Sequence, residues 1–322
     1  MVLLHSCGVR GRLPAYARGS RPGPCVTFPF VNTSREAAGT GVRSALERGA
    51  ARLAAAGIPD PMVDAELLLG HVLGLGRGAV QAAVVMDRGL GDEDAARFAG
   101  LVERRMRREP LQHVTGVAYF RSLALAVGPG VFVPRPETEL LAGLAVDHLL
   151  GVPGQPVAVD LGSGSGAIAL AMASEAPHAR VFAVEYSPAA YPWTLRNARA
   201  AALPNLRTVF DDLGRALPEL DGRVDVVASN PPYVPRAAVP HDPEVRLHDP
   251  EAALYGGEDG LDAVRVLAVR AARLVRPGGL VAIEHGEEQS AGVRAVLEGA
   301  GWHAVAHHRD LTGRDRVTTA LR

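Results

Sequence analysis

The 322-residue chain contains no lysine, so all 34 of its basic residues are arginines. This absence excludes a P-loop lysine, a Schiff-base lysine and a lysine general base. Cysteine is nearly absent as well, with only Cys7 and Cys25, both near the N-terminus. A disulfide framework, a cysteine-rich zinc site and a catalytic thiol in the core are therefore excluded, and no metal site is predicted.

Long apolar runs are also missing. No stretch approaches the roughly 18 residues that a membrane helix needs, and the apolar start of the chain is too short for a signal peptide. The sequence therefore predicts a soluble, cytoplasmic protein without membrane contact. The net charge of −1 argues against a generic nucleic-acid coat protein, which would need a large basic excess.

Charge and composition divide the chain. Residues 1–40 carry five arginines against one acid, a local charge of +4 that leaves −5 for residues 41–322. This first segment is rich in Gly, Pro and Ser and is predicted to be a disordered tail. It is either an organellar transit peptide or, the interpretation we favour, an incidental extension.

Residues 41–115 show a helical period. Val42, Leu46, Ala50 and Leu53 recur at spacings of three and four, which predicts a small helical bundle. The bundle closes with the arginine-rich run 103–109, which is either a solvated helix face or a surface for an anionic partner.

Residues 116–133 switch to a period of two, which predicts a β-hairpin linker between two domains. From residue 134 to 322, strands and helices alternate, which predicts an α/β fold with a doubly wound parallel sheet. Four apolar runs are the expected central strands, and two later segments are expected at the sheet edge. These strands are 157–161, 181–184, 224–228 and 280–283, then 303–307 and 316–321.

A glycine-rich turn follows the first of these strands. Gly162, Gly164 and Gly166 surround Ser163 and Ser165, and the turn opens a helix. Glycines there allow a tight turn and close approach of a ligand to the backbone. Glu185 closes the next strand, 19 residues after Gly166, and a carboxylate at that place can hold both hydroxyls of a ribose.

Two adenosine cofactors compete for this loop. A nicotinamide dinucleotide favours G-x-G-x-x-G, with its pyrophosphate on the helix N-terminus. Here the spacing is G-x-G-x-G, and Asp160 places a carboxylate just before it. An acid suits a sulfonium and an amino group better than a pyrophosphate. The loop therefore favours S-adenosylmethionine.

The turn Asn230-Pro231-Pro232-Tyr233 follows the strand at 224–228. Neither proline has an N–H, so the turn offers carbonyl acceptors without competing donors, and the Asn230 side chain adds another oxygen. A substrate –NH2 group could donate to both acceptors, which would aim its weak lone pair at a methyl donor. Tyr233 could stack on the flat amide or base. The expected catalytic residues are Asn230, Pro231 and Tyr233.

This turn resembles that of amino-group methyltransferases acting on adenine, cytosine or glutamine amide nitrogen. With the helical N-terminal segment, further motifs make residues 41–322 similar to the bacterial release factor glutamine methyltransferases. Those motifs are Glu109-Pro110-Leu111-Gln112-His113-Val114-Thr115-Gly116, Phe132-Val133-Pro134-Arg135-Pro136-Glu137-Thr138-Glu139, Glu284-His285-Gly286 and Asp310-Leu311-Thr312-Gly313-Arg314-Asp315-Arg316.

The resemblance implies a class I methyltransferase fold and methylation of the glutamine in the Gly-Gly-Gln motif of class 1 peptide chain release factors. It puts Gly162 to Gly166 around the methionine moiety, Glu185 at the ribose, and Asp212 with Leu213 beside the adenine. The turn 230–233, Pro232 included, would grip the glutamine, with Phe132 as a wall of that pocket. Pro188 and Pro192 depart from a simple helix start after Glu185.

Several alternatives stay open at this point. Arg135, Glu137 and Glu139 are either functional or a salt-bridge network between domains, whereas His285 is expected to be structural. The activity could instead target a ribosomal-protein glutamine or adenine N6 of a nucleic acid. A nicotinamide oxidoreductase and a non-enzymatic binding module fit the two turns less well. The expected partner is a release factor, with no direct nucleic-acid contact, and the protein is expected to be a monomer.

Overall fold

The computed structural model describes residues 41–322. The predicted disordered tail, residues 1–40, lies outside the described part of the chain. Residues 41–322 lie within a single compact unit, so the predicted domain boundaries at 115 and 133 stay predictions.

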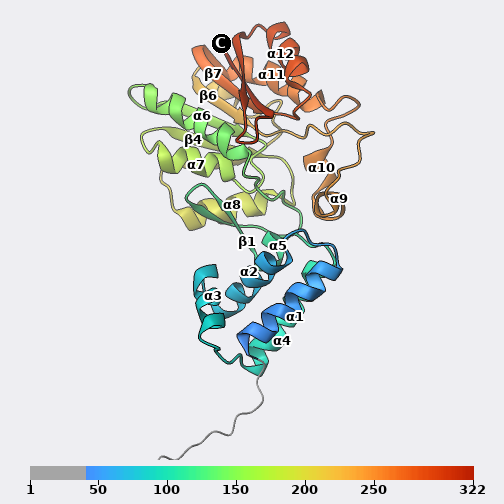
Figure 1. The fold of residues 1–322 in the computed structure, drawn as a ribbon. Coiled ribbons are helices and arrows are strands. Elements are labelled where there is room, and N and C mark those ends of the chain that lie inside the picture. The colour runs from blue at the N-terminus through green and yellow to red at the C-terminus, as the bar shows by residue number, and fades with distance from the viewer. Residues whose placement is uncertain (1–40) are drawn as a thin grey trace, which may run out of the picture. The chain divides into compact units, whose positions relative to one another are not determined.

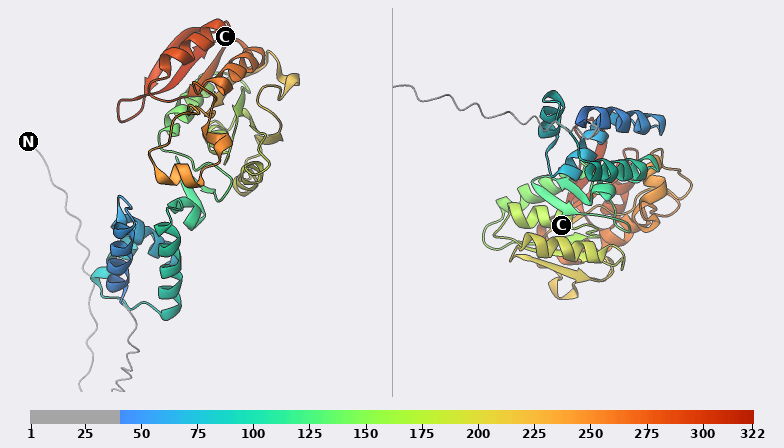
Figure 2. Two further views of the ribbon diagram at one scale, coloured as in Figure 1. Left: turned by 90° about the vertical axis from the view of Figure 1, so that its right-hand side faces the viewer. Right: turned by 90° about the horizontal axis from the view of Figure 1, so that it is seen from below.

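Five helices form the first part of the described chain, coloured blue to teal in Figure 2. The residues spaced three and four apart in the first helix, such as Leu46 and Leu53, are buried together with Leu68, Leu69 and Phe98 of the neighbouring helices. The predicted helical period is thus the period of a shared apolar core. The helices are α1 Val42–Ala55, α2 Pro61–Leu73, α3 Arg77–Val85, α4 Asp92–Met106 and α5 Leu111–Thr115.

No single helix in residues 41–322 is long and apolar enough to cross a membrane. Helices α2 and α3 reach the length and apolar composition of a membrane span only when they are taken together, and the chain bends by 94° between them.

The arginine-rich run at the end of α4 is mostly paired with acids, although Arg107 is exposed and lies 3.6 Å from the exposed Glu103. Arg105 is buried and contacts Asp64 at 2.7 Å and Glu244 at 2.6 Å, while Arg108 reaches Glu244 at 2.6 Å. Arg104 pairs with Glu109. Because acids neutralise most of the run inside the protein, it gives no support to a nucleic-acid partner.

A short antiparallel hairpin follows, formed by β1 (Val117–Phe120) and β2 (Leu123–Ala126). The hairpin was expected to extend through residue 133, but residues 127–133 contain no strand. Pro129 lacks the N–H that a ladder needs. Gly128 lies so close to the Trp193 ring that a Cβ there would be 2.7 Å from it. The backbone packs on a helix at this point and leaves the sheet.

The main sheet has seven strands in the order β5-β4-β3-β6-β7-β9-β8. The first five are parallel, and β9 runs antiparallel to both of its neighbours. All six predicted strands are present, and β5 is the one that was not predicted. The strands are β3 Val157–Leu161, β4 Arg180–Glu185, β5 Leu206–Phe210, β6 Val224–Ser229, β7 Val275–Glu284, β8 His303–Arg309 and β9 Asp315–Leu321.

Helices cover both faces of the sheet, as expected for a doubly wound fold (Figure 1). Helices α6 (Thr138–Gly151) and α7 (Ala167–Glu175) bury one face, with Leu141 and Met172 in its core. Helices α11 (Asp262–Leu274) and α12 (Ser290–Gly299) bury the other, with Leu267 and Leu297 in its core.

Three further helices complete this part of the chain: α8 Tyr191–Ala201, α9 Pro243–His248 and α10 Glu251–Leu254, with a 3-10 turn at Pro218–Leu220. Helix α8 begins at Tyr191, which explains how Pro192 is tolerated. A proline in the first turn removes an N–H that has no partner within the helix.

Candidate active site

The two turns singled out by sequence leave neighbouring strands at the same edge of the sheet. Strands β3 and β6 are paired in parallel, with Asp160 beside Ala228. The Ser229 hydroxyl also donates to the Leu161 carbonyl at 2.6 Å, which ties the two strand ends together. The carboxyl ends of adjacent parallel strands are the usual ligand-binding edge of such sheets.

A cavity of about 510 Å³ opens between these turns. Of the predicted cofactor and substrate residues, all but Asp160 and Gly166 line it. The lining residues among them are Phe132, Gly162, Ser163, Gly164, Ser165, Glu185, Asp212, Leu213, Asn230, Pro231, Pro232 and Tyr233. Residues from five separate segments thus converge on one hollow of cofactor size.

The glycine loop needs its glycines for backbone conformation. Gly162, Gly164 and Gly166 have φ values of +82°, +54° and +87°, which L side chains rarely adopt. No atom lies within 4 Å of where a Cβ would stand on Gly162 or Gly164. The backbone of the loop is therefore exposed to the cavity, which leaves room for the methionine part of a cofactor to approach it.

Glu185 ends β4 and lines the same cavity. Its Oε2 accepts the backbone N–H of Gly164 at 2.8 Å, and its Oε1 accepts that of Ser187 at 2.7 Å. These bonds fix the carboxylate beside the loop, and each of its oxygens keeps a second lone pair for a ligand hydroxyl. Its predicted role toward a ribose stays a prediction.

Asp160 is fully buried behind the loop and does not line the cavity. Its Oδ2 accepts the backbone N–H of Ala169 in the first turn of α7 at 3.1 Å, while its Oδ1 is buried and has no hydrogen-bond partner among residues 41–322. Burial raises the pKa of Asp160 to about 7. The residue supports the loop from behind, and a direct role toward a sulfonium stays a prediction.

Asp212 and Leu213 follow β5 and line the far part of the cavity. The Asp212 Oδ1 accepts the N–H of Gly214 at 2.9 Å, a local turn that holds this carboxylate in place.

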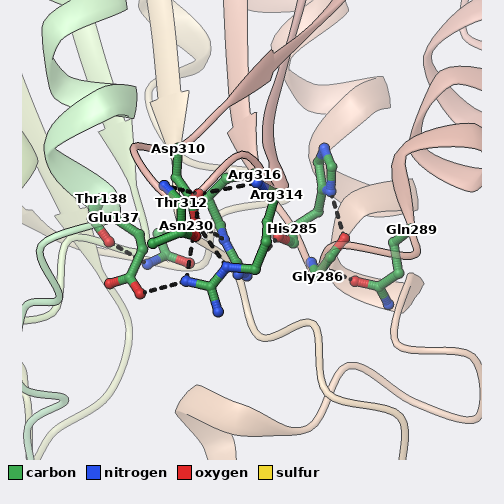
Figure 3. Close-up of polar contacts among 10 residues, drawn as sticks. All are labelled: Glu137, Thr138, Asn230, His285, Gly286, Gln289, Asp310, Thr312, Arg314 and Arg316. Atoms are coloured by element: carbon green, nitrogen blue, oxygen red, sulfur yellow. Dashed lines mark hydrogen bonds and ion pairs between the residues drawn. The ribbon is translucent and has the colours of Figure 1, made fainter.

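The Asn-Pro-Pro-Tyr turn presents acceptors to the cavity. The Asn230 Nδ2 donates to the Thr138 hydroxyl at 3.2 Å, as Figure 3 shows, so the amide nitrogen is already engaged. Within residues 41–322 no hydrogen bond is made to the Pro231 carbonyl. The Tyr233 carbonyl accepts from the Gln289 side chain at 2.9 Å, which anchors the end of the turn.

The Tyr233 ring is suited to packing rather than to proton transfer. Burial raises the pKa of its phenol to about 12, so the hydroxyl stays protonated near neutral pH. Phe132 forms another part of the wall, and the Arg135 guanidinium lies over its ring at 5.0 Å.

The charged residues around Phe132 are structural ion pairs and hydrogen bonds. Arg135 pairs with Asp249 at 2.7 Å and Glu137 with Arg314 at 3.1 Å, while Glu139 accepts the Arg121 N–H of the hairpin at 2.8 Å. The network joins loops around the cavity, and Glu139 connects α6 to the hairpin, since the Arg121 Nη1 also donates to the Glu139 carbonyl at 3.3 Å.

His285 is fully buried, as expected for a structural histidine. Its Nε2 is paired with the Thr318 hydroxyl at 2.7 Å and its Nδ1 with the Gly286 carbonyl at 2.8 Å.

Sequence reasoning missed part of the cavity wall. Thr138 had a signal, since it lies within the quoted motif 132–139. The short helices α9 and α10 had none, because they show no period long enough to recognise. The missed lining residues include Thr138, Val245, Pro250, Ala252, Ala253, Leu254 and Val266.

The chain is similar to proteins of a known family. Residues 44–116 match the family model of the PrmC N-terminal domain, and residues 129–245 match that of the methyltransferase small domain. A release factor glutamine methyltransferase of Streptomyces coelicolor is 50% identical over 272 residues, which cover 84% of this chain and 94% of the relative.

Two further relatives carry the same name. That of Mycolicibacterium smegmatis is 47% identical over 286 residues, or 88% of this chain and 98% of the relative. That of Deinococcus radiodurans is 42% identical over 284 residues, which cover 87% of this chain and 98% of the relative. The predicted enzyme class and the S-adenosylmethionine cofactor are confirmed, and the chain belongs to the release factor glutamine methyltransferase family.

Proposed function

We propose that this chain transfers a methyl group from S-adenosylmethionine to the side-chain amide nitrogen of the glutamine in the Gly-Gly-Gln motif of class 1 peptide chain release factors. The observation that carries the proposal is the placement of Asn230 and the unused Pro231 carbonyl in the same cavity as the glycine loop.

The proposed chemistry rests on positioning. S-adenosylmethionine supplies an electrophilic methyl group on a sulfonium. The glutamine –NH2 donates one hydrogen bond to the Asn230 Oδ1 and one to the Pro231 carbonyl, while Tyr233 packs on the flat amide. These contacts aim the nitrogen lone pair along the methyl–sulfur bond. As the N–C bond forms and the C–S bond breaks, the nitrogen becomes acidic and releases one proton to water.

The cofactor roles are part of the proposal. Glu185 would accept from the ribose hydroxyls, the backbone of Gly162 to Gly166 would surround the methionine moiety, and Asp212 with Leu213 would flank the adenine. Asp160 would hold the loop from behind. No lysine is needed, because no step requires an amine.

A protein substrate suits the charge of the chain. Residues 41–322 carry a net charge of −5, and acids inside the protein neutralise most of the arginine run of α4. The first helices, residues 41–115, are proposed to recognise the release factor. The enzyme is proposed to act as a cytoplasmic monomer, without direct contact to nucleic acid.

Labelled-methyl transfer tests the proposal. The enzyme is incubated with methyl-labelled S-adenosylmethionine and a purified release factor, with either the native Gly-Gly-Gln tip or its Gln→Ala variant. Label is expected in the native protein alone. Label that persists in the Ala variant would overturn the proposal, and label in a ribosomal protein or in RNase-sensitive material would favour the corresponding alternative.

A further inference from the structure

We propose that Glu284 and Thr138 are positioning residues that fix which way the Asn230 amide faces, so that its oxygen rather than its nitrogen meets the substrate. This inference rests on the proposed function, because it assigns the Asn230 oxygen to the substrate –NH2 group.

The three residues come from three different elements. Thr138 is the first residue of α6, Asn230 follows β6, and Glu284 ends β7. Because Ser229 pairs with Ile283 in the parallel β6–β7 ladder, the next residues, Asn230 and Glu284, lie side by side. Thr138 and Glu284 are buried, with 3% and 2% exposure, and within residues 41–322 the Glu284 Oε2 has no hydrogen-bond partner.

The contacts of these three residues lead from the buried Glu284 to Asn230, which lines the cavity. The Asn230 Nδ2 donates to the Thr138 hydroxyl oxygen at 3.2 Å (Figure 3). Burial raises the pKa of Glu284, whereas hydrogen bonding with Thr138 and Asn230 lowers it and so favours the charged form of the carboxyl group.

The donor and acceptor properties of the three groups fix the direction of these hydrogen bonds. An ionised carboxylate only accepts, so in the proposed arrangement the Thr138 hydroxyl donates to Glu284. The Thr138 oxygen then accepts from the neighbouring amide, which must therefore present its –NH2 group. Asn230 is left with Oδ1 facing the cavity, as an acceptor for a substrate –NH2. A flipped amide would turn its –NH2 group toward a substrate N–H and its oxygen toward the accepting Thr138 oxygen, so both contacts would be lost.

The direction depends on the charge of Glu284, and burial raises the pKa of this group to about 7. The charged groups around it are Arg316 on β9, which favours ionisation, and Glu137 before α6, which opposes it. The Tyr233 phenol also faces it and stays neutral. Arg316 itself is directed elsewhere, since its Nη1 donates to the His285 carbonyl at 3.3 Å. A protonated Glu284 becomes a donor toward Thr138 and removes the constraint on the amide.

Four variants of the full chain test the inference. Glu284→Gln keeps the shape but removes the acceptor-only group, and Thr138→Val removes the hydroxyl. Thr138→Ser retains it. Thr319→Val is the matched control, because Thr319 is a buried threonine of β9 whose hydroxyl bonds to His308 at 2.8 Å. For each variant, kcat and KM with a release factor, S-adenosylmethionine affinity, thermal stability and the pH profile are measured.

Glu284→Gln and Thr138→Val are expected to lower kcat about 100-fold, the effect of losing one oriented hydrogen-bonding group at a reaction centre. Thr138→Ser and Thr319→Val are expected to stay within about threefold of wild type, a change that corresponds to less than one weak hydrogen bond. Affinity for S-adenosylmethionine should not change. Wild-type kcat should rise with pH through about 7, and Glu284→Gln should lose that dependence.

Three outcomes separate the possibilities. If wild type methylates the release factor and the folded variants keep its kcat, this inference is overturned alone. The same holds if Glu284→Gln keeps the wild-type pH dependence. If wild type does not methylate the release factor glutamine, the proposed function fails and this inference with it. If Glu284→Gln does not fold, the comparison of Thr138→Val with Thr138→Ser decides.

Discussion

Glu244 of α9 is the residue whose loss should destabilise the protein most clearly. It is buried, with 8% exposure, and accepts from the Arg105 Nη1 and the Arg108 Nη2 at 2.6 Å each. Each such charge-assisted bond contributes about 1.5–3 kcal/mol, and breaking a buried pair costs about 3–5 kcal/mol. Because a glutamine oxygen can keep one of the two bonds, we expect Glu244→Gln to lower the free energy of unfolding by about 3 kcal/mol.

The pH dependence of this loss follows from the pKa of Glu244. Burial opposes ionisation, but hydrogen bonds with Asp242, Arg105 and Arg108 outweigh it and lower the pKa from 4.5 to about 2. The folded chain therefore holds the proton less tightly than the unfolded chain. The stabilisation is complete above about pH 4.5 and is lost as the pH falls toward 2. Glutamine has no such proton, so the difference between wild type and variant should shrink in that window.

Urea unfolding between pH 7 and pH 3, followed by circular dichroism, measures both effects. The matched control is Glu251→Gln on the adjacent helix, because Glu251 is exposed and takes part in no ion pair within the described chain. The control should stay within about 0.5 kcal/mol of wild type, as is usual for surface substitutions. A Glu244→Gln variant that is equally stable at pH 7, or whose deficit is independent of pH, would refute the reasoning.

Three further predictions concern the cofactor, the substrate and the helical core. Glu185→Gln should weaken S-adenosylmethionine binding about 10- to 100-fold by calorimetry, because a charged acceptor for the ribose hydroxyls is lost. Unchanged affinity would show that Glu185 does not bind the ribose. Tyr233→Phe should keep kcat within about threefold, since the phenol stays protonated with a pKa of about 12 and the ring face remains, whereas Tyr233→Ala should lose activity in the methyl transfer assay. Leu53→Ala should lower the free energy of unfolding by about 2–5 kcal/mol in denaturant titration, because Leu53 is completely buried.

The central strands could be predicted because they are buried on both faces. Every residue of Val157–Leu161 and Val224–Ser229 is buried, so both strands appear in the sequence as mostly apolar runs, interrupted only by Asp160, Asp225 and Ser229. Strand β5, Leu206–Phe210, lies at the edge of the sheet, where none of its residues is buried and a run of apolar residues is not required. Its place in the sheet comes from pairing with β4, which a local pattern does not reveal.

The site and the ion pairs near it also contain features that the sequence predicts and features that it does not. The glycine loop and the Asn-Pro-Pro-Tyr turn are contiguous segments whose chemistry can be read locally. Glu244 with Arg105 could not be paired in this way, because 139 residues separate them and the sequence gives each only as a charge. The direction of the Asn230 amide likewise depends on neighbours from α6 and β7, which meet only in the folded sheet.

The pairing of β3 with β6 has a consequence for how such enzymes diversify. The backbone ladder holds neighbouring strands about 4.8 Å apart, so the distance between donor loop and acceptor turn does not depend on the side chains of either. Under the proposed function, substitutions in the turn 230–233 can therefore change the nitrogen that is accepted while the glycine loop 162–166 keeps its geometry. The scaffold separates the choice of acceptor from the use of the methyl donor, and redesign toward another planar nitrogen can begin at residues 230–233 and the walls that face them.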